Sequence, residues 1–447
     1  MPARSSTVAR LVLLTFAATA AGLDARPEAQ TTPTITADAV KRHTVELADD
    51  KYEGRGAGYP GERRAADYIA AEFTKAGLSA AGDSGGYFQE FTFHAFHPVK
   101  PWEILTSRNV IGRIDGSDPG LRREIVVIGA HYDGQGRSGQ ADPFRVMPPG
   151  GGAGDDIWNS ANDNAASVAA VIEIARALKH SAVPPKRTVL FIAFGAEEHG
   201  MTGSIYYVGH PVAPLADHVG MINIEKIGRL PDKPFNTVGN ATSPAWAEIL
   251  KAGQQQIRSP LAMTSPFAVP ESDHYPFAAS RIPAIMLMVS GAPDGHLPSD
   301  SADRIDFDRV AEAAQLVAGA AGELASRPQR PAFSPPPFFD IGISGHLALP
   351  SEADARGVDA PFSGLKVTGV IAGLPGAAAG LQPGDLITDI AGYQFKRDDT
   401  LQALMAMQQE VMQGKRGLVL PMKVKRDQKS LDLTMTLKAS FVSKIER

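Results

Sequence analysis

The sequence contains no cysteine, and this absence excludes several kinds of chemistry. None of its 447 residues can act as a thiolate nucleophile, form a disulfide or bind a metal through sulfur from cysteine. A lipoprotein anchored through an N-terminal cysteine is excluded for the same reason. Any metal site must therefore be built from histidine, aspartate and glutamate side chains.

A strong charge of one sign is also missing. The formal net charge of -5 is small for this length, and no cluster of lysine and arginine stands out. Nucleic acid and anionic membranes are therefore poor candidates as partners. The apolar run Leu11–Gly22 follows Arg4 and Arg10 and is too short to span a bilayer comfortably. We interpret residues 1–25 as a signal peptide, which predicts a periplasmic or secreted protein without a membrane span in its mature chain.

The central feature of the remaining sequence is Thr188–Gly200, written TVLFIAFGAEEHG. Its unbroken apolar run is typical of a strand that is covered on both faces, as in a parallel sheet. Glu197 and Glu198 follow where this strand should end, and ligand sites of open α/β sheets lie beyond the carboxyl ends of their strands. The alternative is a solvated pair of glutamates on a loop, because exposed carboxylates are common.

Similar side chains follow other predicted strands. A strand that covers 124–130 leads into His131 and Asp133, which point the same way in an extended chain. Such an Asp can orient a metal-binding His, although a lone His at a strand end can also be purely structural. The run 219–224 ends in Glu225, and the run 282–289 precedes His296.

Asp163 is the fifth such group, at the predicted start of a helix over 165–179. It could be directed into the site, or it could simply cap the helix, since Asp and Asn are good N-caps. Two histidines and three carboxylates form a suitable set for Zn²⁺ with nitrogen and oxygen ligands. The sequence thus predicts an α/β domain with a mostly parallel central sheet sandwiched by helices, and a metal site at one sheet edge.

The ordered motifs AHYD, NSANDNAAS, FGAEEHG, NIEKIGR, SDHYPF and HLPSDSADRID resemble the dizinc exopeptidases of metallopeptidase family twenty-eight. The similarity covers residues 35–325. It implies two zinc ions held by five side chains: His131, Asp163, Glu198, Glu225 and His296. It further implies that Asp163 bridges both ions, that Glu197 is the general base and that Asp133 orients His131. Asp273 and His274 of the SDH motif are interpreted as pocket-lining residues.

The sequence departs from the family pattern at the site. Glu225 stands where the family most often has Asp, and Lys226 where it most often has Met. Gly295 precedes the last histidine, where an aromatic residue is frequent. His199, His210 and His218 match no family role and are predicted to be structural or on the surface.

A second domain is predicted after the proline-rich segment 326–338, which we interpret as a linker. Residues 339–440, with the run Gly-Leu-Gln-Pro-Gly-Asp at 380–385, resemble a small β-rich PDZ domain of the bacterial, circularly permuted kind. The resemblance implies that backbone N–H groups at 340–342 cradle a carboxylate and that a groove beside a helix near 400–413 accepts an extended peptide. The alternative is a packing module without a ligand.

The sequence therefore predicts an exported dizinc exopeptidase that acts on peptides or proteins, most plausibly as an aminopeptidase. A carboxypeptidase or dipeptidase is the nearest alternative, because the same metals serve either end of a peptide. A glutaminyl cyclase is less favoured, since all five ligands are present. The alternative from another class is a catalytically weak protein that binds peptides through its PDZ groove.

Overall fold

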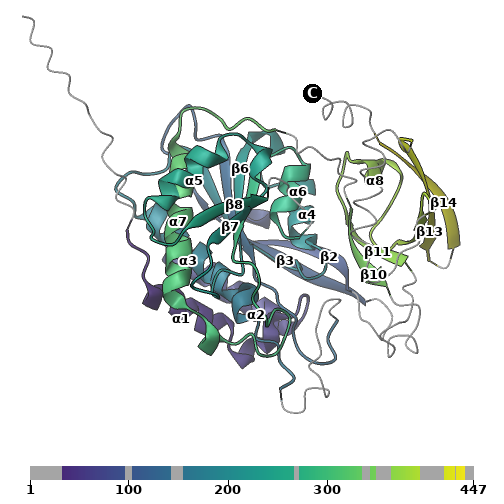
Figure 1. The fold of residues 1–447 in the computed structure, drawn as a ribbon, viewed down its shortest axis with the longest axis horizontal. Coiled ribbons are helices and arrows are strands. Elements are labelled where there is room, and N and C mark those ends of the chain that lie inside the picture. Colours follow the sequence, from purple (N-terminus) through teal and green to yellow (C-terminus); the bar gives the residue numbers. More distant parts are fainter. Residues whose placement is uncertain are drawn as a thin grey trace, which may run out of the picture.

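The computed structural model describes residues 33–95, 103–141, 155–265, 271–334, 343–348, 364–392, 417–427 and 429–437. The predicted signal peptide, the end of the linker and the predicted carboxylate loop and groove helix of the second domain lie outside these ranges. A large α/β unit is followed by a smaller β-rich unit (Figure 1). Within the described ranges, no helix has the length and apolar character that a membrane crossing requires.

The α/β unit has seven α-helices and nine strands among the described residues. The helices are α1 (Ala37–Leu47), α2 (Pro60–Lys75), α3 (Ala166–Lys179), α4 (Thr202–Gly209), α5 (Trp246–Gln254), α6 (His274–Ala279) and α7 (Phe307–Ser326). The strands are β1 (Ser79–Ala80), β2 (Phe88–Ala95), β3 (Glu103–Ile114), β4 (Ile125–His131), β5 (Thr188–Phe194), β6 (His218–Glu225), β7 (Phe235–Val238), β8 (Leu261–Ser265) and β9 (Ala284–Met288).

These strands form one mixed sheet in the order β1-β3-β5-β4-β6-β9-β7-β8, with β2 also paired to β3. The predicted parallel arrangement is present in the central strands β5, β4, β6 and β9, and again between β7 and β8. Both flanks are different, because β3 pairs antiparallel with β1, β2 and β5, and β7 pairs antiparallel with β9. The sheet is therefore mixed, with its parallel core at the predicted site.

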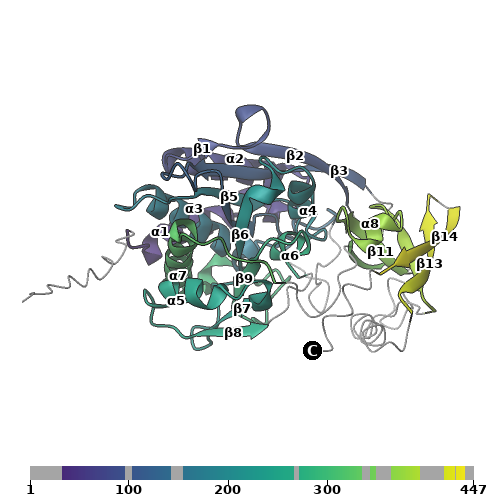
Figure 2. The same cartoon turned by 90° about the horizontal axis from the view of Figure 1, so that it is seen from above.

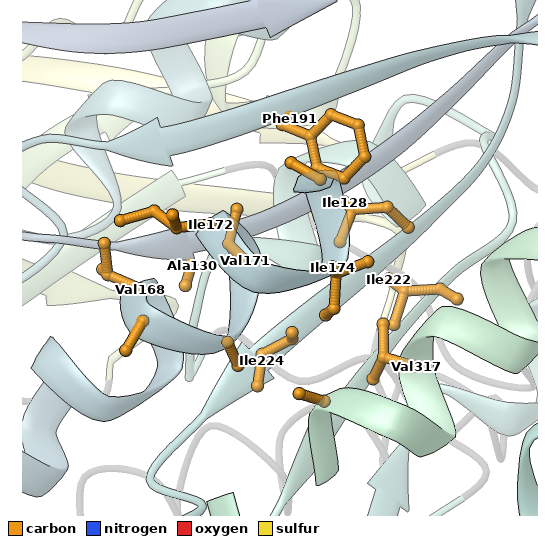
Figure 3. Packing of buried hydrophobic residues seen from close by; sticks show 14 of the residues in the cluster. Ile128, Ala130, Val168, Val171, Ile172, Ile174, Phe191, Ile222, Ile224 and Val317 are labelled. Carbon is orange, nitrogen blue, oxygen red and sulfur yellow. The ribbon is translucent and has the colours of Figure 1, made fainter. Parts of the chain in front are cut away.

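The central strands read as unbroken apolar runs because helices cover both of their faces. Alternate residues of β5 face opposite cores: Phe191 belongs to the larger cluster and Ile192 to the smaller one. The larger cluster includes residues of α3 and α7, and Figure 3 shows Val171 and Val317 of these helices near Phe191 and Ile222. On the other face, α4 and α6 contribute apolar side chains. Burial on both faces fixes the sheet and so fixes where its strands end.

The second unit is a five-stranded antiparallel sheet in the order β10-β11-β12-β13-β14. Its elements are β10 (Ile343–Ala348), β11 (Gly364–Val370), α8 (Pro375–Ala378), β12 (Leu386–Ile390), β13 (Val419–Arg426) and β14 (Lys429–Thr436). It has its own apolar core. Arg426 forms a bidentate ion pair with buried Asp385, in which Nε donates to Oδ1 at 2.6 Å and Nη2 donates to Oδ2 at 2.7 Å. The sheet fits a small β-rich domain, and its assignment as a PDZ domain stays a prediction.

The start of the predicted linker lies against the α/β unit. Ser326 is the last residue of α7, and Arg330 donates to the carbonyl oxygens of Ala216 (2.7 Å) and His218 (2.8 Å). The Ser334 N–H donates to the Thr242 carbonyl at 2.8 Å. The chain therefore remains attached to the first unit up to residue 334.

The two units also meet directly. Ile371, at the end of β11, is buried in a small apolar cluster with Met201 and Tyr275 of the α/β unit. Leu374 packs against the same cluster. Figure 2 shows β11 and α8 on the side of the α/β unit that carries α4 and α6. The contact thus involves the beginnings of two helices that start close to the predicted site.

Candidate metal centre

The predicted ligands gather where the central strands end. His131 is the last residue of β4 and Glu225 is the last residue of β6, while Glu198 lies in the turn that follows β5. His296 comes from the loop between β9 and α7 rather than directly from a strand end. All four nevertheless lie at the same edge of the sheet, and the prediction of His296 at a strand end is replaced by a loop position.

Asp163 does not cap a helix. It lies in a short π-helical turn, Ala161–Ala165, ahead of α3, and the N-cap residue of α3 is Ala165. The side chain of Asp163 is buried, and its carboxylate lies among the basic side chains of His131, His296 and Lys226. Such a group is costly to bury unless a cation compensates it. Of the two interpretations of Asp163, the structure favours the one that directs its carboxylate into the site.

Two sets of three ligand atoms share this carboxylate. In the first set, His131 Nε2 lies 3.4 Å from Asp163 Oδ1 and 3.4 Å from Glu225 Oε1. In the second set, His296 Nε2 lies 3.1 Å from Asp163 Oδ2 and 3.5 Å from Glu198 Oε2. Each oxygen of Asp163 therefore faces a different histidine, and each of these histidines lies beside a different glutamate.

These distances fit zinc. Ligands about 2.0–2.1 Å from a tetrahedral zinc ion lie about 3.3–3.4 Å from one another. The atom pairs above, at 3.1 to 3.5 Å, have this spacing. Ligand atoms of His131, Asp163 and Glu198 also lie within 4.8 Å of one another, and all three residues are buried. The nitrogen and oxygen donors at this spacing therefore suit a zinc centre.

Asp133 connects the first histidine to the two glutamates. Its carboxylate accepts hydrogen bonds from the backbone N–H groups of Glu197 (3.0 Å) and Glu198 (3.1 Å). His131 Nδ1 lies 3.2 Å from the backbone carbonyl of Asp133 and 3.6 Å from its carboxylate. A carbonyl can only accept, so Nδ1 carries the proton and Nε2 is left for a metal. Asp133 thus touches His131 mainly through its backbone.

The extra methylene of Glu225 is accommodated by two hydrogen bonds. Glu225 Oε2 accepts from Asn164 Nδ2 at 3.1 Å and from Ser272 Oγ at 2.9 Å. Ser272 in turn accepts from Asn223 Nδ2 at 2.8 Å. These contacts hold Oε2 away from the centre and leave Oε1 beside His131. Glu225 can therefore present one oxygen as a ligand despite its length.

Several supporting residues were not predicted from the sequence. Gln135 donates to Glu198, and the carboxylate of Asp300 accepts from the backbone N–H groups of Asn162 (2.9 Å) and Asp163 (3.0 Å). The buried guanidinium of Arg55 donates only to backbone carbonyl oxygens: Tyr132, Leu47, Asn159 and Ser160. The sequence did contain a signal for most of these residues, since Asn164, Ser272 and Asp300 lie inside the motifs that carry the family resemblance, and Arg55 lies in the glycine-rich turn before α2.

Charge is concentrated in the site. Burial raises the pKa of the Glu197 carboxyl well above its ordinary value, and repulsion from Glu225 and Glu198 raises it further. Attraction to Glu198 raises the pKa of His296 to about 10. The side chain of Glu197 is 11 % exposed, that of His296 24 % and that of Lys226 31 %, whereas His131 is fully buried. The site therefore opens to solvent on the side of these three residues.

His199, His218 and the SDH motif lie inside the fold. His199 packs against Phe93 and His218 Nε2 lies 2.8 Å from the Tyr207 hydroxyl, and both histidines are buried. Ser204 Oγ donates to Asp273 at 2.5 Å. His274 is buried at the start of α6. The interpretation of Asp273 and His274 as lining residues of a substrate pocket stays a prediction.

Glu62 of α2 is a buried carboxyl beneath the turn that carries Glu197. It accepts hydrogen bonds from the Gly58 N–H at 2.6 Å and from the Ser107 hydroxyl. Burial raises its pKa to about 8, and the nearby Asp133 contributes in the same direction. Between its ordinary pKa near 4.5 and about 8, the folded chain keeps a proton that the unfolded chain has lost. Rising pH must therefore destabilise the folded state across this window.

We expect Glu62→Gln to weaken this pH dependence, because a glutamine can accept from Gly58 and donate to Ser107 without titrating. The variant should be more stable than the wild type at pH 8, by on the order of a few kcal/mol, and the difference should shrink toward pH 5. Urea unfolding at several pH values measures this, with Glu248→Gln as the control because the Glu248 side chain is 79 % exposed. Parallel pH profiles for wild type and Glu62→Gln would contradict the assignment.

The mixed sheet and the buried His, Asp and Glu side chains at its edge describe an α/β protein with a candidate zinc centre. Two solved structures share this fold. A zinc aminopeptidase from Bacillus subtilis has a TM-score of 0.51 at 20% sequence identity, and the match covers 66% of this chain and 96% of that chain. A leucine aminopeptidase precursor from Bacteroides thetaiotaomicron VPI-5482 has a TM-score of 0.51 at 18% identity, and the match covers 65% of this chain and 98% of that chain. At these identities the likeness concerns the fold alone.

Residues 109–321 match the family described as Peptidase family M28, and this region contains all of the predicted site residues. Aminopeptidase YwaD of Bacillus subtilis (strain 168) is 30% identical over 245 residues, which are 52% of this chain and 48% of that protein. Leupeptin-inactivating enzyme 1 of Streptomyces exfoliatus is 27% identical over 303 residues, 67% of this chain and 56% of that protein. The chain thus spans about half the length of these relatives. The matches support the predicted resemblance to zinc exopeptidases, which are metal-dependent hydrolases.

Proposed function

We propose that the protein is an exported zinc-dependent aminopeptidase with two zinc ions. The observation that carries this proposal is the position of Asp163 between two histidines. Its Oδ1 faces His131, which lies beside Glu225, and its Oδ2 faces His296, which lies beside Glu198. The first three residues would hold one ion, and the second set would hold the other. Bound zinc would supply a Lewis acid for the scissile carbonyl and would lower the pKa of a nearby water.

The chain's own residues would move the proton. Glu197 Oε2 lies 3.9 Å from His131 Nε2, so the carboxylate is beside the first set of ligands without belonging to it. A carboxylate at this position can accept a proton from a water beside these ligands. We assign it the transfer of a proton from the attacking water to the leaving nitrogen. Asp133 would position it, because its carboxylate binds the N–H of Glu197.

We favour an aminopeptidase over other exopeptidases because one relative, YwaD of Bacillus subtilis, is named an aminopeptidase. The purified full chain should release residues from peptides with a free N-terminus. N-terminal acetylation should abolish cleavage, whereas amidation of the C-terminus should not. The reverse pattern would identify a carboxypeptidase, and cleavage of dipeptides alone would identify a dipeptidase. A zinc-loaded protein without turnover on any peptide would instead favour the peptide-binding alternative.

A further inference from the structure

Lys226 places a cation at the candidate metal centre. It directly follows β6, and its ammonium Nζ lies 3.1 Å from Asp163 Oδ2 and 3.4 Å from Glu225 Oε1. These are oxygens of the two carboxylates that face His131 and His296. The Lys226 side chain is 31 % exposed, so it lies on the open side of the site. Its charge is therefore next to the ligands and also within reach of a bound molecule.

The backbone holds this lysine in place. The Lys226 N–H donates to Asn164 Oδ1 at 3.1 Å, and the amide of the same Asn164 donates to Glu225 Oε2 at 3.1 Å. Lys226 has a positive φ of 49°, which is uncommon for a residue other than glycine. A strained backbone that is kept by specific hydrogen bonds is often found where a side chain has a functional position.

The Lys226 ammonium has at least one N–H that can donate to a bound molecule. A lysine has three N–H donors, and the two neighbouring oxygens, Asp163 Oδ2 and Glu225 Oε1, can occupy at most two of them. Two other basic residues, Arg55 and Arg229, are engaged elsewhere. Arg55 is fully buried and donates to backbone carbonyls, and Arg229 forms an ion pair with Asp294. Gly295, which precedes His296, has no side chain and so offers no side-chain donor.

We propose that Lys226 is a catalytic residue whose third N–H donates to the substrate oxygen that becomes negatively charged when water attacks the scissile carbonyl. The proposal rests on the peptidase function proposed above. A fixed cation at this point would favour the tetrahedral state over the neutral carbonyl, because its attraction grows with the developing charge. A substrate carboxylate could use the same donor, but it would be bound already in the ground state.

The test compares Lys226→Met with Lys226→Arg and the wild type. We expect Lys226→Met to lower kcat by about 10²-fold with little change in KM, as the loss of one oxyanion donor does. The affinity for a phosphinic pseudopeptide, which mimics the tetrahedral state, should fall by a similar factor in calorimetry. Lys226→Arg should recover part of both losses. Zinc content should stay the same in all three proteins.

Two results would overturn the proposal. An increase in KM at unchanged kcat, restricted to substrates with a free carboxylate, would show ground-state recognition of that carboxylate. If Lys226→Met changes the zinc content but leaves kcat per bound zinc unchanged, Lys226 only balances the charge of the ligands. A wild type that cleaves no peptide refutes the peptidase function itself, so the two failures remain distinguishable. Lys226→Gln, compared by thermal unfolding, replaces Lys226→Met if that variant is unstable.

Discussion

Glu197→Gln should reduce turnover by about 10²–10⁴-fold while zinc stays bound, the usual effect of losing a positioned acid–base group. The amide has the same shape as the carboxylate but cannot accept the proton of the attacking water. Zinc binding should be unaffected, because Glu197 belongs to neither set of ligand atoms and its backbone N–H keeps the bond to Asp133. Steady-state kinetics and metal analysis on the same preparation measure both quantities.

Glu197→Asp provides the matched comparison, because it keeps the carboxylate and withdraws it by one methylene. Its activity should lie between those of the wild type and Glu197→Gln. Near-normal turnover of Glu197→Gln at full zinc content would show that another group accepts the proton.

Glu225→Ala should lower the zinc content from two ions toward one per chain and abolish most peptidase activity. The variant loses Oε1, which faces His131 at 3.4 Å, and leaves two ligands in the first set. It also removes the acceptor of the Ser272 hydroxyl and one of the two acceptors of the Asn164 amide. Metal analysis after dialysis, together with turnover, measures the effect.

Glu271→Ala is the control for Glu225→Ala, because Glu271 is an exposed carboxylate close enough to feel the charges of Lys226 and Glu225. It should keep both zinc ions and its activity. Two zinc ions that remain tightly bound in Glu225→Ala would mean that another residue has taken the ligand position. Thermal unfolding of the zinc-free proteins separates a lost ligand from a general loss of structure.

The positions of the site residues were predictable because the signal is local. An apolar run such as 188–194 defines a buried strand, and a strand end fixes where the next side chains lie. The arrangement of the strands was not predictable in this way. Strand β5 lies between β3 and β4, although β3 and β4 are neighbours in the sequence. Pairing between distant segments leaves no periodic pattern, so the antiparallel flanks were missed.

The contacts around the ligands were the other unpredictable part. The sequence raised two possibilities for Asp163, and only the turn ahead of α3 distinguished them. It marked Lys226 as unusual but did not show that its ammonium reaches the carboxylate of Asp163. Side-chain contacts of this kind depend on backbone angles after a strand end, such as the positive φ of Lys226. A motif identifies the residues but not these angles.

The contact between Ile371 and Met201 lets the second unit stabilise the turn that carries Glu197. Met201 precedes α4, and its N–H donates to the carbonyl oxygen of Glu197 at 2.8 Å. Its side chain is 4 % exposed because Ile371 and Tyr275 cover it. Local opening of a segment costs least where few buried apolar contacts oppose it. Removal of the second unit would expose Met201 and would therefore lower the free energy needed to open the turn at Glu197. The smaller unit thus raises the local stability of the larger one at its candidate site.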